Sequence, residues 1–373
     1  MKIYWYWPFV REEELAAGKA LALMGHHVCV HTIAGRVDTA RFGDSLTLDE
    51  SVPAVTPKTE GTLKWLASRT TTYPSRARVR ANAVSHASYD VAHVIYLNYF
   101  TDWVALRAIS RHVPLVSTVH DVVPHQSRVP RRIERELLAR QYDAAGTIVV
   151  HHPLVGERLI DEFSVDPARI HHIPWPVPLV ANGEYRTPRS RLQILMFGTL
   201  RRNKGVDVMI EALRRIPTAD LQLTIAGQGF ADIEASVRTA AASDHRIRAE
   251  LGFVSAERKA DLFQAADVVA LPYTSFSSQS AVLHDAYAYH RPVIVSDVGA
   301  LGRSVRDDQT GWIVDPNEPD QLAEAILLAI ADGVGHATYS EHARIVAEQR
   351  SPAAVAERLA NLYQICAKFG ANL

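Results

Sequence analysis

Short apolar runs alternate along this chain with longer segments in which apolar residues recur at helical spacing. Runs of this kind predict buried strands, and the segments between them predict amphipathic helices. The predicted strands lie at residues 2–7, 28–33, 91–96, 115–119, 147–150, 192–197, 221–226, 268–271, 293–296 and 312–314. Strands that alternate with helices form parallel sheets with right-handed crossovers, so we expect the α/β class.

The alternation stops between residues 174 and 191, where four prolines and the pair Asn182-Gly183 mark a linker. We therefore expect two doubly wound, Rossmann-like domains at residues 1–180 and 191–351. The closing helical segment, 352–373, is expected to pack back onto the N-terminal domain. Ligands of such sheets bind beyond the carboxyl ends of the strands, so a cleft between two facing domains is the expected site.

Composition narrows the classes of function. The chain has 373 residues and a formal net charge of −1, which argues against nucleic acid as a partner. Cys29 and Cys366 are its only cysteines, which fits a reducing cytoplasm. No apolar run approaches the roughly 20 residues that span a bilayer, and the first residues have the pattern of a strand rather than a signal peptide.

The segment LQILMFGTLRRNKG, residues 192–205, carries the most chemistry. An apolar strand ends at Gly198, two arginines and Lys204 follow, and a helical pattern begins after Gly205. A helix N-terminus offers N–H groups and partial positive charge, and the side chains add full charges, so this turn suits a phosphate. The Walker pattern is absent, and a solvated basic turn is the alternative.

Three further loops fall at the same predicted sheet edge. They are AGQG at 226–229, GFV at 252–254 and the serine-rich loop that opens PYTSFSSQSAVLHDAYAYHRPVIVSDVG at 272–299. Together with FGTLRRNKG and TGWIV, these motifs make residues 192–330 resemble the nucleotide-sugar domain of the retaining glycosyltransferases of family four, which have the GT-B fold. The N-terminal half resembles the family more faintly, as expected for a half that binds the variable acceptor.

The resemblance implies an enzyme that moves a hexose-type sugar from a nucleotide-diphosphate sugar to an acceptor hydroxyl. Its catalytic cations would be Arg201 and Lys204, which grip the departing diphosphate. The N–H groups of Ala281 and Val282, at a helix start, would bind the same phosphates, and Ser280 stands in the donor loop before them. UDP is the first expected nucleotide and GDP the second, on family frequency.

The remaining donor contacts also follow from the resemblance. The backbone near Phe253 and Val254 would meet the base, and Asp285 would hold the ribose hydroxyls where the family has a longer glutamate. Ser277 stands in place of the family's first glutamate, near the donor sugar. This departure leaves open a non-catalytic nucleotide-sugar-binding partner subunit, and a sugar-nucleotide epimerase or phosphorylase of the same fold is a third alternative.

In the N-terminal half, the resemblance places His120, after the strand 115–119, beside a hydroxyl of the donor sugar as a catalytic residue. Asp121 and His125 are expected on the acceptor side. Arg11 is expected there too, after the first strand, where the family has a glycine pair. A structural histidine and a solvated arginine at a helix start are the corresponding alternatives.

Two basic segments, residues 62–86 and 128–140, can form an acceptor-site lid or dock on anionic lipid, and we favour the lid. The protein is expected in the cytoplasm, with peripheral contact at the inner membrane face as an alternative. Its acceptor can be a glycan, a lipid-linked sugar or a small molecule. The histidine pairs lack zinc spacing and there is no Asp-x-Asp pattern, so we expect no metal and no cofactor. The expected reaction is a front-face attack.

Overall fold

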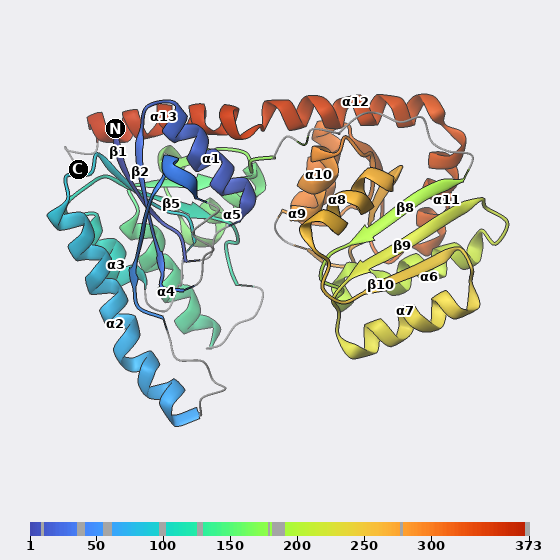
Figure 1. Ribbon diagram of the computed structural model, residues 1–373, viewed down its shortest axis with the longest axis horizontal. Helices are drawn as coiled ribbons and strands as arrows, with labels where there is room; N and C mark the ends of the chain where they lie inside the picture. The colour runs from blue at the N-terminus through green and yellow to red at the C-terminus, as the bar shows by residue number, and fades with distance from the viewer. Residues whose placement is uncertain are drawn as a thin grey trace. The chain divides into compact units, whose positions relative to one another are not determined.

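The structure is a computed structural model, and it describes residues 1–8, 11–35, 42–54, 62–96, 102–124, 130–177, 180, 191–276 and 279–369. The chain divides into two compact units (Figure 1). Unit 1 comprises Met1–Pro176 and Pro352–Leu373, and unit 2 comprises Val177–Ser351. Each unit is built around a parallel sheet of its own.

Within the described residues, unit 1 has a sheet with the strand order β3-β2-β1-β4-β5-β6-β7, in which all neighbours run parallel. The strands are β1 (Lys2–Tyr6), β2 (His27–Ile33), β3 (Thr47–Val52), β4 (Val91–Val94), β5 (Leu115–Val119), β6 (Thr147–Val150) and β7 (Ile170–His172). The helices are α1 (Glu12–Leu23), α2 (Thr62–His86), α3 (Asp102–Ile109), α4 (Arg131–Ala144), α5 (Pro153–Phe163) and α13 (Pro352–Phe369), with 3-10 turns η2 (Gly43–Ser45) and η4 (Pro167–Arg169).

Helices cover both faces of this sheet. Successive residues of a strand point to opposite faces, so β1 contributes to two cores. Ile3 and Trp5 pack with α1 and α13, whereas Tyr4 and Tyr6 pack with α2 and α3. A parallel sheet buried on both faces needs strands that are apolar throughout, which is the pattern of β1.

Tyr363 ties the C-terminal helix α13 to the centre of the sheet. Its fully buried phenol oxygen accepts a hydrogen bond from the indole N–H of Trp5 at 3.0 Å and hydrogen-bonds to Nδ1 of His93 at 2.5 Å. The helix that ends the described chain is therefore part of the core of unit 1, although it follows the whole of unit 2 in the sequence.

Unit 2 has the described strand order β10-β9-β8-β11-β12-β13, again with all neighbours parallel. The strands are β8 (Leu192–Phe197), β9 (Leu221–Gly227), β10 (Ile247–Leu251), β11 (Val268–Leu271), β12 (Val293–Ser296) and β13 (Gly311–Val314). The helices are α6 (Val206–Arg215), α7 (Ala231–Ser243), α8 (Ala256–Ala265), α9 (Ala281–Ala288), α10 (Gly299–Asp308), α11 (Pro319–Ala331) and α12 (Gly333–Gln349), with the 3-10 turn η5 (Arg202–Lys204).

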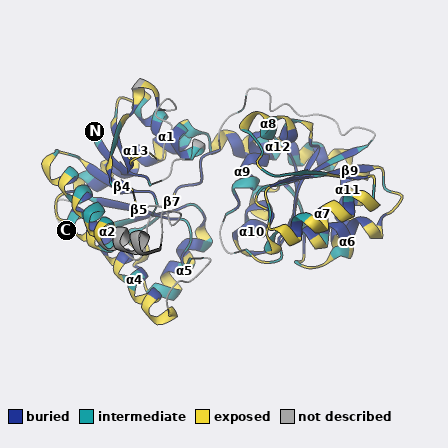
Figure 2. Ribbon diagram, turned by 60° about the horizontal axis from the view of Figure 1, so that its bottom comes forward, coloured by how far each residue is buried: buried dark blue, intermediate teal, exposed yellow. Residues whose placement is uncertain are grey.

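The sheet of unit 2 is also covered on both sides. Ile194 and Met196 of β8 pack with α6, α7 and α11, whereas Leu195 packs with α8, α9 and α12. Figure 2 shows the outcome: the strands are largely dark blue, and α6 and α7 carry yellow, exposed residues along one side. None of the helices in the described part of the chain is both long and apolar enough to cross a membrane.

The expected α/β class with two Rossmann-like sheets is confirmed. The strands β5, β6, β8, β11 and β12 have the predicted bounds, and the strand predicted at residues 91–96 ends earlier, at Val94. The pattern did not predict β3, β7 or β10. Of the expected linker, residues 178–179 and 181–190 lie outside the described residues.

Candidate functional site

The cationic turn after β8 depends on two glycines in left-handed backbone. Gly198 has φ +115° and Gly205 has φ +69°. A Cβ on Gly205 would lie 1.8 Å from the carbonyl oxygen of Pro272, so only glycine lets this turn pack against the end of β11. The carbonyl oxygen of Asn203 accepts a hydrogen bond from the N–H of Thr274 at 3.0 Å. The turn is thereby fixed to the loop that follows β11.

Lys204 ends the turn η5 and lies over two aromatic rings. Its Nζ is 3.6 Å from the ring centroid of Tyr273 and 5.0 Å from that of Phe276. Burial, with a smaller contribution from the Arg201 guanidinium, lowers the pKa of Lys204 to about 8. This ammonium is partly desolvated and lies over aromatic faces. An anion that binds it therefore has less water to displace.

Arg201 precedes Lys204 and is more exposed. Its charge acts on Lys204, so the two cations are neighbours, as the sequence predicted. Arg201 also lines a surface depression of about 200 Å³ together with Val206 and Asp232. Arg201 is therefore the exposed cation of the turn, whereas Lys204 is partly buried over the aromatic rings.

The N-terminus of α9 approaches the end of β8. Ser280 precedes the helix, is buried, and hydrogen-bonds through Oγ to the phenol of Tyr273 at 2.9 Å. A Cβ on Gly198 would lie 3.3 Å from Cγ2 of Val282, so the first turn of α9 packs directly against the glycine that ends β8. The first N–H groups of a helix have no intrahelical carbonyl partner, so Ala281 and Val282 present theirs beside the cationic turn.

Asp285 lies one turn further along α9 and is 8% exposed. Its Oδ1 is 2.5 Å from Nζ of Lys259 on α8. The ribose-binding acid expected from the sequence is thus half of an ion pair, and its partner Lys259 was not recognised. A lysine on one helix and an aspartate on another, 26 residues apart, leave no local signal in the sequence.

Phe253 and Val254 follow β10, where the base was expected. Gly252 has φ +116° and donates its N–H to the carbonyl of Gly227 at 3.1 Å, which holds the loop at the sheet edge. Phe253 is 91% exposed, and it lines an open hollow of about 560 Å³ with Val254 and Arg258. An exposed aromatic ring beside a hollow of this size is suited to a flat heterocycle.

In unit 1, His120 follows β5, and its ring contacts the rings of Tyr96, His151 and Trp175. Its Nε2–H donates to the carbonyl of Ile95 at 3.0 Å, which leaves Nδ1 as the acceptor. The imidazole stacks on Tyr96 with ring centroids 4.2 Å apart and an interplanar angle of 8°. Burial, with smaller effects of the neighbouring His151 and of the Arg11 charge, holds the pKa of His120 well below its usual range, so the ring is neutral near pH 7.

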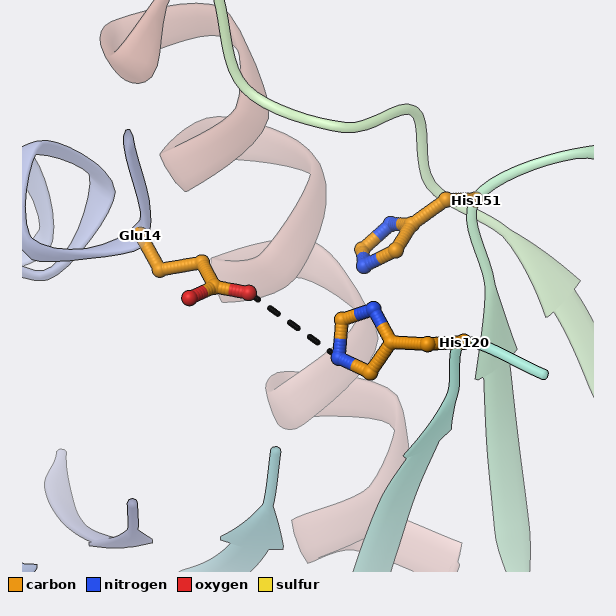
Figure 3. A group of neighbouring side chains, drawn as sticks. All are labelled: Glu14, His120 and His151. Atoms are coloured by element: carbon orange, nitrogen blue, oxygen red, sulfur yellow. Dashed lines mark ion pairs between the residues drawn. The ribbon is translucent and has the colours of Figure 1, made fainter. Parts of the chain in front are cut away.

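Glu14 on α1 completes this group, and the sequence analysis did not single it out. Its Oε1 accepts a hydrogen bond from the phenol of Tyr96 at 2.9 Å and lies 3.9 Å from Nε2 of His120. Burial raises the pKa of Glu14 to about 8. Figure 3 shows the carboxyl pointing toward His120, with the His151 ring next to the His120 ring.

These three side chains are also the described group best placed to ligate a metal. The ligand atoms of Glu14, His120 and His151 all lie within 4.8 Å of one another. Carboxylate and imidazole suit zinc. Burial raises the pKa of Glu14 to about 8, and burial, with a smaller effect of the Arg11 guanidinium, lowers the pKa of both histidines. Both imidazoles are therefore neutral near pH 7, which is the form that ligates a metal, whereas a metal ion would have to displace the proton of Glu14.

The other expected acceptor-side residues do not all lie next to His120. The guanidinium of Arg11 lies 5.1 Å from the Trp175 ring and 5.7 Å from the Tyr96 ring, which places it beside His120. The carboxylate of Asp121 helps to raise the pKa of the Tyr142 phenol, so it lies toward α4. His125 and Ser277 fall outside the described residues.

Comparison with known proteins gives family matches to both halves of the chain. Residues 15–180 match Glycosyltransferase Family 4, and residues 191–332 match Glycosyl transferases group 1. A D-inositol 3-phosphate glycosyltransferase of Xylanimonas cellulosilytica is 31% identical over 288 residues, covering 70% of this chain and 68% of the relative. Its namesake from Arthrobacter sp. is 31% identical over 266 residues, covering 65% of this chain and 62% of the relative. The chain thus spans less than two thirds of the length of the Arthrobacter relative.

The fold is likewise shared with solved structures. The crystal structure of HepE from Anabaena in complex with UDP superposes with a TM-score of 0.72 at 16% identity, covering 98% of this chain and 100% of that chain. The shared architecture is the GT-B fold. The matches to both halves and the similarity to the Xylanimonas relative show that this chain belongs to glycosyltransferase family 4.

Proposed function

We propose that this chain moves a hexose-type sugar from a nucleotide-diphosphate sugar to an acceptor hydroxyl, with retention of configuration. The observation that carries the proposal is the placement of Lys204. Its ammonium lies over Tyr273 at the carboxyl edge of the second sheet, in the turn that the family uses for phosphate. Family membership and the names of the curated relatives support a glycosyl transfer.

In this proposal the diphosphate is bound by three elements of unit 2. Lys204 and Arg201 supply full charges, and the first N–H groups of α9, at Ala281 and Val282, supply a helix N-terminus. Cleavage of the sugar–phosphate bond leaves negative charge on the departing diphosphate. Fixed donors aimed at developing charge commonly contribute about 3–4 kcal/mol each to transition-state stabilisation.

The other donor contacts are proposed from the residues described above. Phe253 and Val254 bind the base, Asp285 the ribose, and Ser280 and His120 the sugar hydroxyls. The Anabaena protein of the same fold was solved with UDP, so UDP is the first nucleotide to test and GDP the second.

The reaction we propose is a front-face displacement. The acceptor oxygen bonds to the anomeric carbon on the face from which the phosphate oxygen departs, and that phosphate oxygen takes the acceptor's proton. No side chain then has to act as a general base. Bound metal is not part of this proposal, because Lys204 and Arg201 supply the positive charge.

The acceptor is proposed to bind unit 1, with Arg11, Asp121 and His125 on its side. The curated relatives are named D-inositol 3-phosphate glycosyltransferases, so D-inositol 3-phosphate is the first acceptor to test. Glycans and lipid-linked sugars come next. The exposed arginines Arg131 and Arg132 at the start of α4 would also attract a lipid-linked acceptor or an anionic membrane.

A transfer assay tests the proposal. The protein is incubated with UDP-, GDP- and ADP-sugars and the acceptor panel, and the anomeric configuration of any product is read by NMR. We expect an α-linked product from an α-linked donor, and loss of that product in Lys204→Ala. Nucleotide binding without turnover across the whole panel would indicate a binding subunit instead. A changed sugar from the donor alone would indicate an epimerase, and sugar release onto inorganic phosphate a phosphorylase.

A further inference from the structure

The ion pair between Lys259 and Asp285 joins two helices that both begin at the carboxyl edge of the sheet in unit 2. Lys259 lies in the first turn of α8, and Asp285 in the second turn of α9. The side chain of Lys259 is 32% exposed, and that of Asp285 is 11% exposed. The more accessible member of the pair is therefore the ammonium.

Two contacts locate this pair beside the cationic turn. Nζ of Lys259 lies 6.0 Å from the ring centroid of Phe197, the last residue of β8. The Asp285 carboxylate is near enough to Tyr273 to contribute to the raised pKa of that phenol, and the Tyr273 ring lies under Lys204. The pair and Lys204 are thus both neighbours of Tyr273.

The Lys259–Asp285 pair offers a ligand both hydrogen-bond donors and an acceptor. A buried carboxylate is costly unless it is paired, and the ammonium of Lys259 neutralises Asp285. An ammonium has three N–H donors, and Asp285 accepts from one of them. Among the described residues, Asp285 is the only side chain that hydrogen-bonds to it. A lysine–aspartate pair combines N–H donors with a carboxylate acceptor, which complements two adjacent hydroxyls, because each hydroxyl both donates and accepts.

We propose that Lys259 is a donor-binding residue that, together with Asp285, clamps the vicinal hydroxyls of the nucleotide ribose. The inference rests on the proposed function, since it places a nucleotide at this edge. Asp is one methylene shorter than Glu, and Lys259 supplies a second contact to the diol. The alternative is an ion pair that only holds α8 against α9.

The test measures whether the protein distinguishes ribose from deoxyribose. UDP, GDP and ADP are titrated calorimetrically, and the tightest binder is then compared with its 2′-deoxy and 3′-deoxy forms. The variants are Lys259→Met, which keeps the apolar stem, Lys259→Arg, which keeps the charge, and Asp285→Asn. Lys19→Met on α1 is the matched control. Thermal unfolding of every variant checks that the protein is folded.

We expect the wild type to bind the ribonucleotide about 10-fold more tightly than the deoxy forms, as for one charge-assisted hydrogen bond. Lys259→Met and Asp285→Asn should reduce this preference to within about 2-fold, whereas Lys259→Arg and Lys19→Met should retain it. A preference that survives in Lys259→Met would overturn the inference, even if both affinities and the melting temperature fall together. Absence of nucleotide binding by the wild type would instead refute the proposed function, and the clamp with it.

Discussion

The ammonium of Lys204 lies 3.6 Å from the centroid of the Tyr273 ring, at the end of the turn that follows β8. The aromatic face replaces water on one side of this charge. The attraction between Lys204 and a bound phosphate would therefore be screened less than in bulk water. We expect Lys204→Met to weaken UDP binding by about 10- to 100-fold, the range for hydrogen bonds to charged groups. Arg202→Met is the control, because Arg202 lies in the same turn but is exposed and paired with Asp232. Equal losses in the two variants would argue against a specific role for Lys204.

Nucleotide affinity should also depend on pH through Lys204. Burial lowers the pKa of this ammonium to about 8, so the free protein loses the charge as the pH rises through that value. We expect UDP affinity to be highest near pH 7, where the terminal phosphate of UDP is ionised and Lys204 is charged, and to fall above pH 8, with proton uptake on binding in that upper range. Calorimetry in buffers of different ionisation enthalpy measures the uptake. In Lys204→Arg the fall should move beyond pH 10, because a guanidinium stays charged.

The strands that the sequence did not predict are all at sheet edges. β3 ends the first sheet on one side, β7 ends it on the other, and β10 ends the second sheet. An interior parallel strand is buried on both faces and is a continuous apolar run, which is why β5 and β8 were predicted with their observed bounds. In β10, Arg248 and Glu250 interrupt the apolar pattern and pair with each other at 3.0 Å. Charges of this kind protect an edge and remove its sequence signal.

The residues of the candidate site also differ in how far the local sequence predicts them. Lys204 and Gly205 were predictable, because a strand, a glycine, a cation and a helix follow one another within one short segment. Lys259 meets Asp285, and Glu14 meets His120, only through the packing of separate elements. Such contacts depend on helix orientation, which the local pattern does not specify.

A methyl group at Gly205 should destabilise unit 2. The residue has φ +69°, and an added Cβ would lie 1.8 Å from the carbonyl oxygen of Pro272. We expect Gly205→Ala to lower the free energy of unfolding by about 2–4 kcal/mol, from left-handed strain and the backbone clash together. Gly333→Ala is the matched control, since a Cβ there meets nothing within 4 Å. Denaturant unfolding measures both, and comparable stabilities would contradict the packing described.

Replacement of His120 should separate catalysis from nucleotide binding. Its imidazole is held by Ile95 and Tyr96 and is proposed to contact the sugar, whereas unit 2 is proposed to bind the nucleotide. We expect His120→Asn to lower kcat by about 100-fold, a typical loss for a positioned hydrogen-bonding group, and to leave UDP affinity within 2-fold. The exposed His112 supplies the control, His112→Asn. A matching loss of UDP affinity would contradict the assignment of His120 to the sugar.

The buried carboxyl of Glu14 should make the stability of unit 1 depend on pH. Burial raises its pKa from 4.5 to about 8, against the opposing effects of the Tyr96 hydrogen bond and the Arg11 charge. Because the folded pKa is the higher one, the folded state holds an extra proton between pH 4.5 and 8. The contribution of this group to stability is therefore full below pH 4.5 and is lost as the pH rises, at up to about 1.4 kcal/mol per pH unit.

Glu14→Gln removes this titration and keeps an oxygen that can accept from Tyr96. We expect its melting temperature to lie near that of the wild type at pH 5 and above it at pH 8.5, with a gap that widens steadily between the two. Calorimetric scans at half-unit steps of pH measure the gap, and Asp161→Asn, at an exposed acid on α5 of the same unit, serves as the control. If the Glu14→Gln and wild-type curves run parallel across this range, then the carboxyl is ionised in the folded protein, and the neutral group around His120 does not exist.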